Sequence, residues 1–337
     1  MIREAIEKLI KGSDLTQDES SQVMEEIMTG EATPAQFGAF VIGLRLKGET
    51  VDEMTGLASV MRVKSLKVDF RGPSVDTCGT GGDDLGTFNI STVAAFVVAG
   101  AGIAVAKHGN RAMTSRSGSA DVLEKQGIKI DLGPEGVKKC MEEVGIGFMF
   151  APRFHPAMKF AVQPRREIGV RTVFNILGPL TNPAGAEAQV LGVPSKAVGE
   201  KMVQVLQRLG SRRAIVVHGE DGLDEISLTG NTNVWELGEE GIRRYTVGPD
   251  DLGLAPASLE SLAGGSVEEN AGTMTEVLKG ASGPRRDVVL ANAAGGIVAG
   301  GKAADLPEGV RVAQEAIDSG RALGKLEALR ELSQGLE

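Results

Sequence analysis

The sequence predicts an α/β protein with a smaller all-α domain, in which helices flank a mainly parallel central sheet. Residues 1–70 contain only helical patterns, with apolar side chains at three- and four-residue spacing. Beyond them, short β-rich runs alternate with helical runs, which is typical of parallel strands joined by helices. The length of 337 residues is sufficient for two structural units. We therefore expect a helical domain at 1–70, joined by roughly 156–185, and an α/β domain at 71–337.

The composition argues against two classes of protein. A net charge of -9 disfavours non-specific nucleic-acid binding, because such binding depends on a basic surface. The longest apolar run, "AAFVVAGAGIAVA", has about 13 residues, whereas a membrane span needs about 20. The start of the chain lacks a signal-peptide core, and Cys78 and Cys140 are too few for a disulfide framework. We expect a cytoplasmic protein that binds neither nucleic acid nor a membrane.

Four helices are expected in the first 70 residues. Their patterns are "REAIEKLI", "TQDESSQVMEEIMTG", "TPAQFGAFVIGLRLKG" and "TVDEMTGLASVMRVKS". Thr16, Thr33 and Thr50 stand where N-caps belong, and Gly30 and Gly48 stand at helix ends. The run "FGAFVIGL" is apolar on more than one face, so we expect it to pack on another helix or on a second subunit.

The α/β part begins after "RGPS". A short polar strand leads into the helical run "ISTVAAFVVAGAG". Further strands are expected at "GIAVAKHG", "GIGFMFAP" and "RRAIVVHG", and further helices at "SGSADVLEKQG", "PSKAVGEKMVQVLQRLG" and over about the last 55 residues. A helical stretch, "HPAMKFAVQPRREIG", interrupts the alternation and is expected to rejoin the N-terminal helices.

The stretch "DTCGTGGDDLGTFNIST" reads as a phosphate-binding loop between a strand and a helix. Glycines let backbone N–H groups approach a phosphate, and the helix N-terminus adds unpaired donors. Asn89, Ser91 and Thr92 stand where that helix starts, and a Ser hydroxyl can ligate Mg²⁺. An ordinary strand–turn–helix with Ser91 or Thr92 as the cap explains the glycines equally well.

Two details separate this loop from a nucleotide fingerprint. Thr87 follows Gly86 where a P-loop would carry Lys, which excludes a P-loop NTPase. Asp83 and Asp84 would repel a bare polyphosphate. They suit ribose hydroxyls, loop orientation or a metal ion instead.

A second candidate anion site follows the next strand. Cationic and hydroxyl side chains are interleaved there, at Lys107, His108, Asn110, Arg111, Thr114, Ser115, Arg116, Ser117 and Ser119. The alternative is a solvated basic loop. Two phosphate-competent loops at successive strand ends favour a ligand with phosphates at both ends, because open α/β sheets bind ligands in that crevice.

These motifs resemble those of the anthranilate phosphoribosyltransferase family. "GTGGD", "FNIST", "KHGNR", "SGSADVLE", "HPAMK", "RTVFNILGPLTNPAG" and "DGLDEIS" occur in the family's order, over nearly the whole chain. The resemblance implies the nucleoside phosphorylase/phosphoribosyltransferase type of fold and a homodimer. It implies transfer of 5-phosphoribosyl from phosphoribosyl pyrophosphate to the amine of anthranilate, with release of pyrophosphate, in tryptophan biosynthesis.

The resemblance also implies which residues contact phosphoribosyl pyrophosphate. They are Gly79, Gly82, Asp83, Thr87, Asn89, Ile90, Ser91, Thr92, Lys107, His108, Gly109, Asn110, Arg111, Ala112, Met113, Thr114, Ser115 and Ser119. Two Mg²⁺ ions are implied at Ser91, Asp224 and Glu225. Mg²⁺ takes carboxylate, phosphate and water oxygens, although adjacent carboxylates on a loop are usually only solvated.

Anthranilate is a flat carboxylate with a weakly basic amine, and a carboxylate suits a bidentate Arg. In register with the family motif, Arg165 takes this role, with Asn110 and Gly79 also near anthranilate. Pro164 departs from the family pattern, and a Pro inside a helix removes one N–H and can bend it. His108 and His155 are candidate general bases or orienting groups, unless the ortho carboxylate of anthranilate accepts the proton itself.

Two alternatives remain at this point. A pyrimidine nucleoside phosphorylase-like enzyme of related architecture would use inorganic phosphate, but the "KHGNR" loop and the acidic "LDE" motif suit a pyrophosphate–Mg²⁺ donor better. A non-catalytic nucleic-acid-binding relative would need a basic surface, which the charge of -9 opposes.

Overall fold

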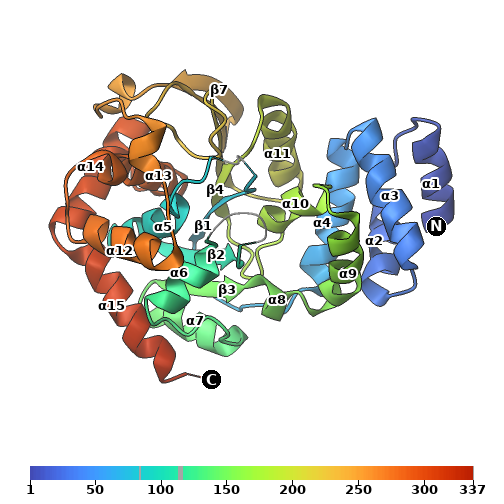
Figure 1. The fold of residues 1–337 in the computed structure, drawn as a ribbon, viewed down its shortest axis with the longest axis horizontal. Coiled ribbons are helices and arrows are strands. Elements are labelled where there is room, and N and C mark those ends of the chain that lie inside the picture. The colour runs from blue at the N-terminus through green and yellow to red at the C-terminus, as the bar shows by residue number, and fades with distance from the viewer. Residues whose placement is uncertain (83–84, 113–116, 337) are drawn as a thin grey trace.

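The computed structural model describes residues 1–82, 85–112 and 117–336. A bundle of helices at the N-terminal end lies beside a larger body built around one sheet (Figure 1). Within the described ranges, no helix has the length and apolar character needed to cross a membrane.

The four expected N-terminal helices are present with the expected caps. They are α1 (Ile2–Ile10), α2 (Gln17–Thr29), α3 (Pro34–Lys47) and α4 (Val51–Lys64). Thr16, Thr33 and Thr50 each accept a hydrogen bond from the third helical residue, whose side chain reaches back to the cap's N–H. Gly30 ends α2 at φ 81° and Gly48 ends α3 at φ 87°, a backbone region that glycine adopts without strain.

A buried carboxylate holds the first helices together. Glu53 is fully buried and accepts hydrogen bonds from Leu15 N at 2.9 Å and Thr50 N at 2.8 Å, and it pairs with Lys47 Nζ at 3.0 Å. We expect Glu53→Ala to lower the free energy of unfolding by about 3–5 kcal/mol, because Lys47 loses its buried carboxylate partner and two N–H groups lose their acceptor. Asp14→Ala removes the exposed partner of the same lysine, so its cost should stay below about 1 kcal/mol. Equal shifts of the urea midpoint for the two variants would contradict this assignment.

One seven-stranded sheet forms the centre of the α/β part, in the order β3-β2-β1-β4-β5-β6-β7. Its strands are β1 (Ser74–Gly79), β2 (Ala104–Gly109), β3 (Ile146–Phe150), β4 (Ala188–Gly192), β5 (Arg213–Gly219), β6 (Thr232–Gly238) and β7 (Gly241–Val247). The first five strands in this order are parallel, whereas β6 pairs antiparallel with both β5 and β7. This confirms a mainly parallel sheet. Strands β4, β6 and β7 are not among those expected from the sequence.

Helices cover both faces of the sheet. Those of the α/β part and the connecting segments are α5 (Ile90–Gly100), α6 (Ser119–Lys125), α7 (Pro134–Glu143), α8 (Ala151–Phe154), α9 (Lys159–Ile168), α10 (Phe174–Leu177), α11 (Lys196–Arg208), α12 (Val267–Leu278), α13 (Pro284–Ala299), α14 (Leu306–Asp318) and α15 (Arg321–Gln334). The described residues also form short 3₁₀ helices, namely η1 (Pro156–Met158), η2 (Gly178–Leu180), η3 (Asp250–Leu252) and η4 (Leu259–Leu262).

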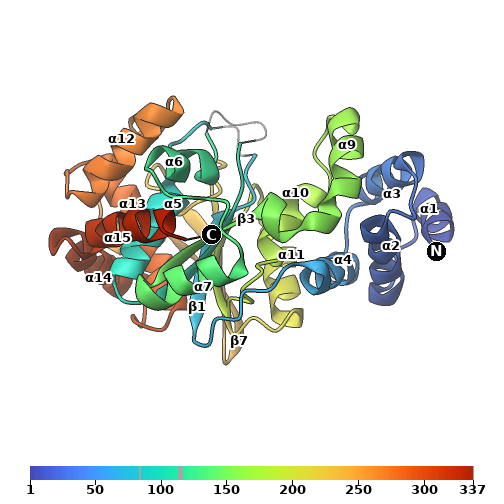
Figure 2. The ribbon, with the colours of Figure 1, turned by 90° about the horizontal axis from the view of Figure 1, so that it is seen from below.

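Alternate residues of β5 enter two different hydrophobic cores. Ile215 and Val217 join the core formed with α5, α13, α14 and α15. Ala214 and Val216 join the core that contains α11 and the N-terminal helices. Successive side chains of a strand point to opposite faces, so each face has its own helical layer (Figure 2).

The helix α9 lies against α2 and α3, although more than 100 residues separate it from them in sequence. Figure 1 shows α9 standing beside these N-terminal helices and apart from the sheet. This packing supports our proposal that roughly 156–185 belongs with the helical domain. It also carries Arg165 to the boundary between the helices and the α/β part.

Candidate functional site

Four parallel strands end at the same edge of the sheet. Gly79, Gly109, Gly192 and Gly219 are the last residues of β1, β2, β4 and β5. The loops that follow β1, β2 and β5 are the two predicted phosphate loops and the acidic loop, which we define as residues 220–231. The fold therefore brings these three predicted features together, where ligands bind in open α/β sheets.

Asp224 of the acidic loop lies directly over the ends of β1 and β4. Gly81 N donates to Asp224 Oδ2 at 2.8 Å. A Cβ atom built at Gly79 would lie 2.3 Å from the same oxygen, and one at Gly192 would lie 1.5 Å from Asp224 O. Both strands must therefore end in glycine, because any side chain there would displace the acidic loop.

Glu225 reaches the N-terminus of α5. Its Oε1 accepts a hydrogen bond from Ser91 N at 3.1 Å, and Ser91 O accepts one from Thr77 Oγ1 at 3.1 Å. The positive end of the helix stabilises the carboxylate there. The structure thus brings the three predicted metal ligands, Ser91, Asp224 and Glu225, to one place.

The donor chemistry of this place fits Mg²⁺. It offers two carboxylates and one hydroxyl, all hard oxygen ligands. Among the described residues there is no group of three or more His, Cys, Asp or Glu side chains arranged to hold a metal. A site with few protein ligands suits Mg²⁺, which keeps several waters and shares phosphate oxygens.

The other predicted residues of the first loop lie in different structural environments. Ile90 and Thr92 are buried in α5, and Thr87 pairs with Ala263 through an isolated β-bridge. Asn89 is the N-cap of α5, but its side chain makes no cap bond. The alternative in which Ser91 or Thr92 caps the helix is therefore wrong, because α5 begins one residue before Ser91.

Asn89 instead joins the two phosphate loops. Its Nδ2 donates to Ser117 O at 3.1 Å, and Ser117 Oγ donates to Asn89 Oδ1 at 3.3 Å. The two loops therefore meet at the front of α5. This contact explains why a polar residue precedes an otherwise apolar helix.

Lys107 is buried at the floor of the site. Its Nζ donates to Thr77 O at 2.6 Å. Burial lowers the pKa of the Lys107 ammonium, and the nearby Asp76 carboxylate acts in the opposite direction. Burial also raises the pKa of Asp76 to about 6, although the Lys107 charge and a hydrogen bond from Asn182 oppose that rise.

Asp76 and Asn182 are residues that the sequence reasoning missed. Asp76 Oδ1 accepts from His108 N at 3.2 Å, while Asn182 Nδ2 donates to Asp76 Oδ2 and to Ala106 O, both at 2.8 Å. The two residues lie in the quoted motifs "DTCGTGG" and "GPLTNPAG". Their place in these motifs could have marked them as site residues. Nothing in the sequence indicates that they pair with each other across 106 residues.

Arg171 was also left without a role by the sequence reasoning. Its Nη2 donates to Gly81 O at 2.6 Å. A Cβ atom at Gly82 (φ 81°) would lie 1.6 Å from Arg171 Nη1, so the guanidinium packs directly on this glycine. Arg171 thus contacts the first phosphate loop from the segment that follows α9.

The second loop is organised by Asp121. Its Oδ2 accepts from Ala112 N at 3.1 Å and Gly118 N at 2.9 Å. Asn110 O accepts from Ser119 Oγ at 3.3 Å. A Cβ atom at Gly109 would lie 2.3 Å from the same hydroxyl, so the loop folds back closely on the start of α6.

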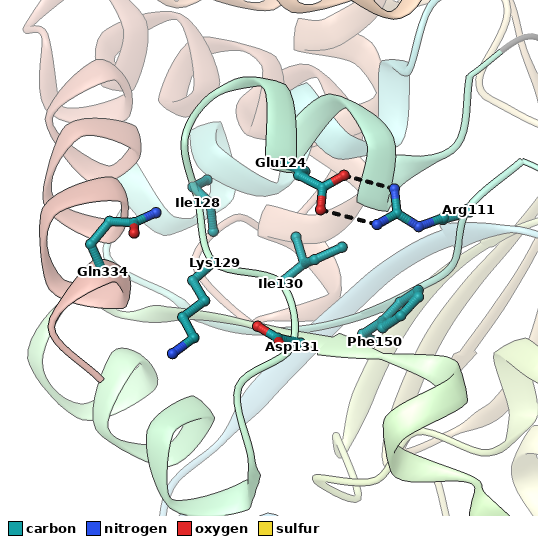
Figure 3. A pocket seen from close by; sticks show the side chains of 8 residues that line it. All are labelled: Arg111, Glu124, Ile128, Lys129, Ile130, Asp131, Phe150 and Gln334. Atoms are coloured by element: carbon teal, nitrogen blue, oxygen red, sulfur yellow. Dashed lines mark hydrogen bonds and ion pairs between the residues drawn. The ribbon is translucent and has the colours of Figure 1, made fainter. Parts of the chain in front are cut away.

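The guanidinium of Arg111 points away from this edge. It pairs with Asp121 and Glu124 and lies 5.7 Å from the ring centroid of Phe150. Arg111, Glu124 and Phe150 line an outer pocket of about 330 Å³, together with Lys129 (Figure 3). A role for Arg111 in substrate binding therefore stays a prediction.

Five residues of the prediction lie outside the described part of the chain. They are Asp83, Asp84, Met113, Thr114 and Ser115, and Arg116 of the second candidate anion site lies outside it as well. Their assignment as substrate contacts, and the unassigned role of Asp84, rest on the sequence alone.

Arg165 is placed on α9 as a half-buried cation. Its guanidinium lies 5.7 Å from the ring centroid of Phe174. Burial lowers the pKa of this guanidinium. Pro164 lies inside α9, which still runs without interruption from Lys159 to Ile168.

His108 and His155 form a buried pair, with ring centroids 5.0 Å apart. In both rings Nε2 has no hydrogen-bond partner among the described residues. Burial lowers the pKa of His108 to about 3 and that of His155 to about 4, with further lowering from neighbouring positive groups. Both imidazoles are therefore neutral near pH 7.

Family models match both parts of the chain. Residues 3–65 match the helical bundle domain of a glycosyl transferase family, and residues 71–323 match the a/b domain of a glycosyl transferase family. The second match alone covers more than half of the chain.

Individual relatives match nearly the whole length. An anthranilate phosphoribosyltransferase of Dehalococcoides mccartyi is 56% identical, with 100% of this chain and 99% of the relative covered. The crystal structure of the enzyme of that name from Thermus thermophilus is similar with a TM-score of 0.93 and 45% identity, over 98% of this chain and 99% of the other. The Saccharomyces cerevisiae enzyme in complex with PRPP and Mg gives a TM-score of 0.92 at 28% identity, over 99% and 98%.

Proposed function

The chain belongs to the anthranilate phosphoribosyltransferase family, and we propose that its reaction takes place where β1, β2, β4 and β5 end. This reaction transfers the 5-phosphoribosyl group of phosphoribosyl pyrophosphate to the amine of anthranilate. The products are N-(5-phosphoribosyl)anthranilate and pyrophosphate, a step consistent with tryptophan biosynthesis. One observation carries the placement: the acidic loop bonds to both the first phosphate loop and the start of α5.

The donor has a pyrophosphate at C1 and a phosphate at C5. The backbone N–H groups of the first loop, the hydroxyls of Ser91 and Thr92, and the Lys107 ammonium supply donors and positive charge for these groups. The second loop, through Asn110 and Ser119, completes this set. Such fixed donors act mainly by orienting the donor and stabilising developing charge.

We assign Ser91, Asp224 and Glu225 to Mg²⁺, in two ions as the family resemblance implies. When bound, Mg²⁺ neutralises charge on the departing pyrophosphate. The yeast relative in complex with PRPP and Mg supports the assignment of the ion. The two carboxylates are held in place by Gly81 N and Ser91 N, so their orientation is set before any ion arrives.

We place the carboxylate of anthranilate on Arg165, with Asn110 and Gly79 nearby. The planar guanidinium can bind a carboxylate with two parallel hydrogen bonds. The guanidinium carbon lies over the Phe174 ring, 5.7 Å from its centroid. A yeast relative in complex with 4-fluoroanthranilate, with a TM-score of 0.89 and 27% identity, supports an aromatic acceptor of this kind.

We propose that neither His108 nor His155 acts as the general base. Burial disfavours a cationic imidazole at either position, as their pKa values of about 3 and 4 indicate, whereas a carboxylate that takes the proton becomes neutral. The amine attacks C1 on the face opposite to the pyrophosphate, so the configuration at C1 inverts. The C1–N bond forms as the C1–O bond breaks, the pyrophosphate takes the bond electrons, and the amine proton passes to the ortho carboxylate of anthranilate.

The neutral His155 has a consequence for stability. When folded, His155 stays neutral down to a pKa of about 4, whereas unfolded it takes a proton below about 6.5. The unfolded state then binds more protons, so stability should fall as the pH decreases through this window. We expect wild type to lose stability relative to His155→Gln, on the order of 3 kcal/mol between pH 7 and pH 4, in urea unfolding. A difference that does not change with pH would contradict the neutral assignment.

The activity is tested with purified protein, Mg²⁺, anthranilate and phosphoribosyl pyrophosphate, following the loss of anthranilate fluorescence. We expect consumption that depends on all three additions. No consumption by folded protein would overturn the function. Phosphate-dependent cleavage of thymidine or uridine would instead favour the nucleoside phosphorylase alternative.

We also propose a cytoplasmic homodimer. Ile10 of α1, Leu46 of α3 and Val63 of α4 are 77%, 83% and 75% exposed, so three N-terminal helices each present a large apolar side chain to solvent. A second subunit that covers the N-terminal helices would bury them. Sedimentation at micromolar concentration measures this directly.

A further inference from the structure

The acidic loop is supported from below by Asn292, an interior residue of α13. Asn292 is only 2% exposed and lies 66 residues beyond Ile226 of the loop in sequence. Buried amides are almost always hydrogen-bonded, and those bonds show what such a residue holds. Here they hold the backbone next to Glu225.

The side chain of Asn292 pairs with both polar groups of Ile226. Its Oδ1 accepts from Ile226 N at 2.8 Å, and its Nδ2 donates to Ile226 O at 3.0 Å. The remaining amide hydrogen goes to Val288 O of its own helix, at 2.9 Å. All the hydrogen-bonding groups of this amide are thus engaged, and the pattern requires one donor group and one acceptor at fixed positions.

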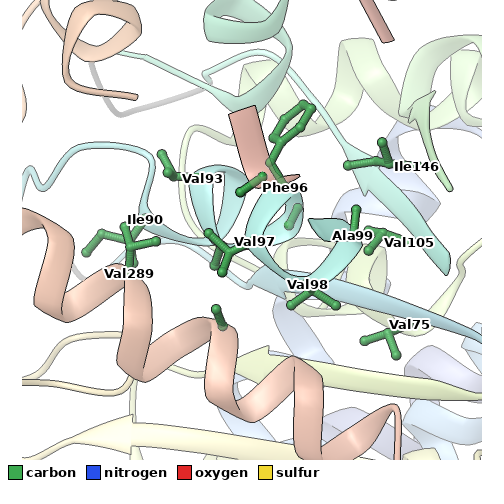
Figure 4. Packing of buried hydrophobic residues seen from close by; sticks show 14 of the residues in the cluster. Val75, Ile90, Val93, Phe96, Val97, Val98, Ala99, Val105, Ile146 and Val289 are labelled. Atoms are coloured by element: carbon green, nitrogen blue, oxygen red, sulfur yellow. The ribbon is translucent and has the colours of Figure 1, made fainter. Parts of the chain in front are cut away.

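The helix that carries Asn292 is a rigid support. All residues of α13 from Val288 to Ala299 are buried. Figure 4 shows Val289 of this helix packed beside Ile90 of α5, so α13 also supports the helix that presents Ser91. Interiors packed in this way do not deform gradually, so the position of Asn292 is fixed.

The rest of the acidic loop has its own anchors. Asp221 accepts hydrogen bonds from Leu223 N at 3.0 Å and Ser227 Oγ at 2.6 Å, and it also accepts one from Thr229 Oγ1. Loss of Asn292 would therefore release the Ile226 peptide without removing these bonds. The expected displacement is confined to the segment that contains Asp224 and Glu225.

We infer that Asn292 is a positioning residue, which fixes the direction in which Asp224 and Glu225 present their carboxylates to Mg²⁺ and the pyrophosphate. The inference rests on the role proposed above for those two carboxylates. A displacement of about 1 Å at such groups can lower a rate by roughly 100-fold. Asn292 is buried and its amide is fully engaged, so it acts through the acidic loop.

The test compares Asn292→Ala and Asn292→Asp with Ile297→Ala, a control on the same helix. Ile297 is fully buried, and no hydrogen bond joins its side chain to the acidic loop. Initial rates are measured against Mg²⁺, phosphoribosyl pyrophosphate and anthranilate in turn, with melting temperatures recorded for each variant. For both Asn292 variants we expect the half-saturating Mg²⁺ concentration and the KM for phosphoribosyl pyrophosphate to rise about 10-fold or more. The KM for anthranilate should change less than about 2-fold.

The outcomes separate this inference from the proposed function. Asp224→Asn and Glu225→Gln are measured in the same series. If they leave the Mg²⁺ dependence unchanged, the role proposed for the carboxylates fails, whatever Asn292 does. The inference is overturned if those two variants raise the half-saturating Mg²⁺ concentration, but the Asn292 variants behave like Ile297→Ala at a matched loss of melting temperature. Failure of both Asn292 variants to fold would also overturn it, because the residue would then serve the fold as a whole.

Discussion

Asp224→Asn and Glu225→Gln are each expected to lower kcat/KM for phosphoribosyl pyrophosphate roughly 100- to 1,000-fold, the loss typical of removing one group that stabilises transition-state charge. Both replacements keep the size of the side chain and an oxygen that can accept from Gly81 N or Ser91 N. The acidic loop should therefore keep its shape while one negative charge is lost. The measurement is the initial rate over a range of Mg²⁺ concentrations.

The dependence on Mg²⁺ identifies the cause of this loss. If the carboxylates hold the ion, a higher Mg²⁺ concentration should restore part of the activity of each variant by mass action. Glu220→Gln is the matched control, because Glu220 belongs to the same loop but pairs with Lys196 at the surface. It should alter the rate less than about 2-fold, as expected for an exposed ion pair. Full activity of the Asp224 and Glu225 variants would contradict the metal assignment.

The parts of the fold that depend on local sequence could be predicted. Thr16, Thr33 and Thr50 cap helices because a cap requires only residues three positions apart. The strands β2, β3 and β5 are apolar runs bounded by turns, and periodicity finds such runs. Strand β7 was missed because its residues are largely exposed or half-buried, with Arg243 and Arg244 in its centre. Its pairing with β6 therefore leaves little apolar pattern in the sequence.

The site could be predicted only as far as its motifs reach. Residues within one motif are visible in sequence, so Gly79, Ser91 and Asp224 could be predicted as site residues. Asn182 and Asn292 each act on a backbone or carboxylate more than 60 residues away, and a lone Asn in a helix or loop carries no local signal. Arg111 shows the opposite case. Its motif suggested a phosphate contact, but Asp121 and Glu124 bind its guanidinium in an outer pocket.

Arg165→Ala is expected to raise the KM for anthranilate roughly 10- to 100-fold, because a charge-assisted hydrogen-bonded pair contributes about 1.5–3 kcal/mol. The KM for phosphoribosyl pyrophosphate should change far less, since Arg165 lies on α9 and not on the phosphate loops. Arg165→Lys keeps the charge but loses the planar fork and its packing on Phe174, so it should recover only part of the affinity.

Arg166→Ala is the matched control, because Arg166 is the next residue of the same helix but is exposed. If both arginines affected anthranilate equally, the effect would reflect net charge and not a specific contact. A rise mainly in the KM for phosphoribosyl pyrophosphate would place Arg165 with the phosphates and leave the anthranilate carboxylate to another cation. Arg171, which already contacts Gly81 O, would then be the next residue to test. The two KM values thus decide between two arrangements of the same three arginines.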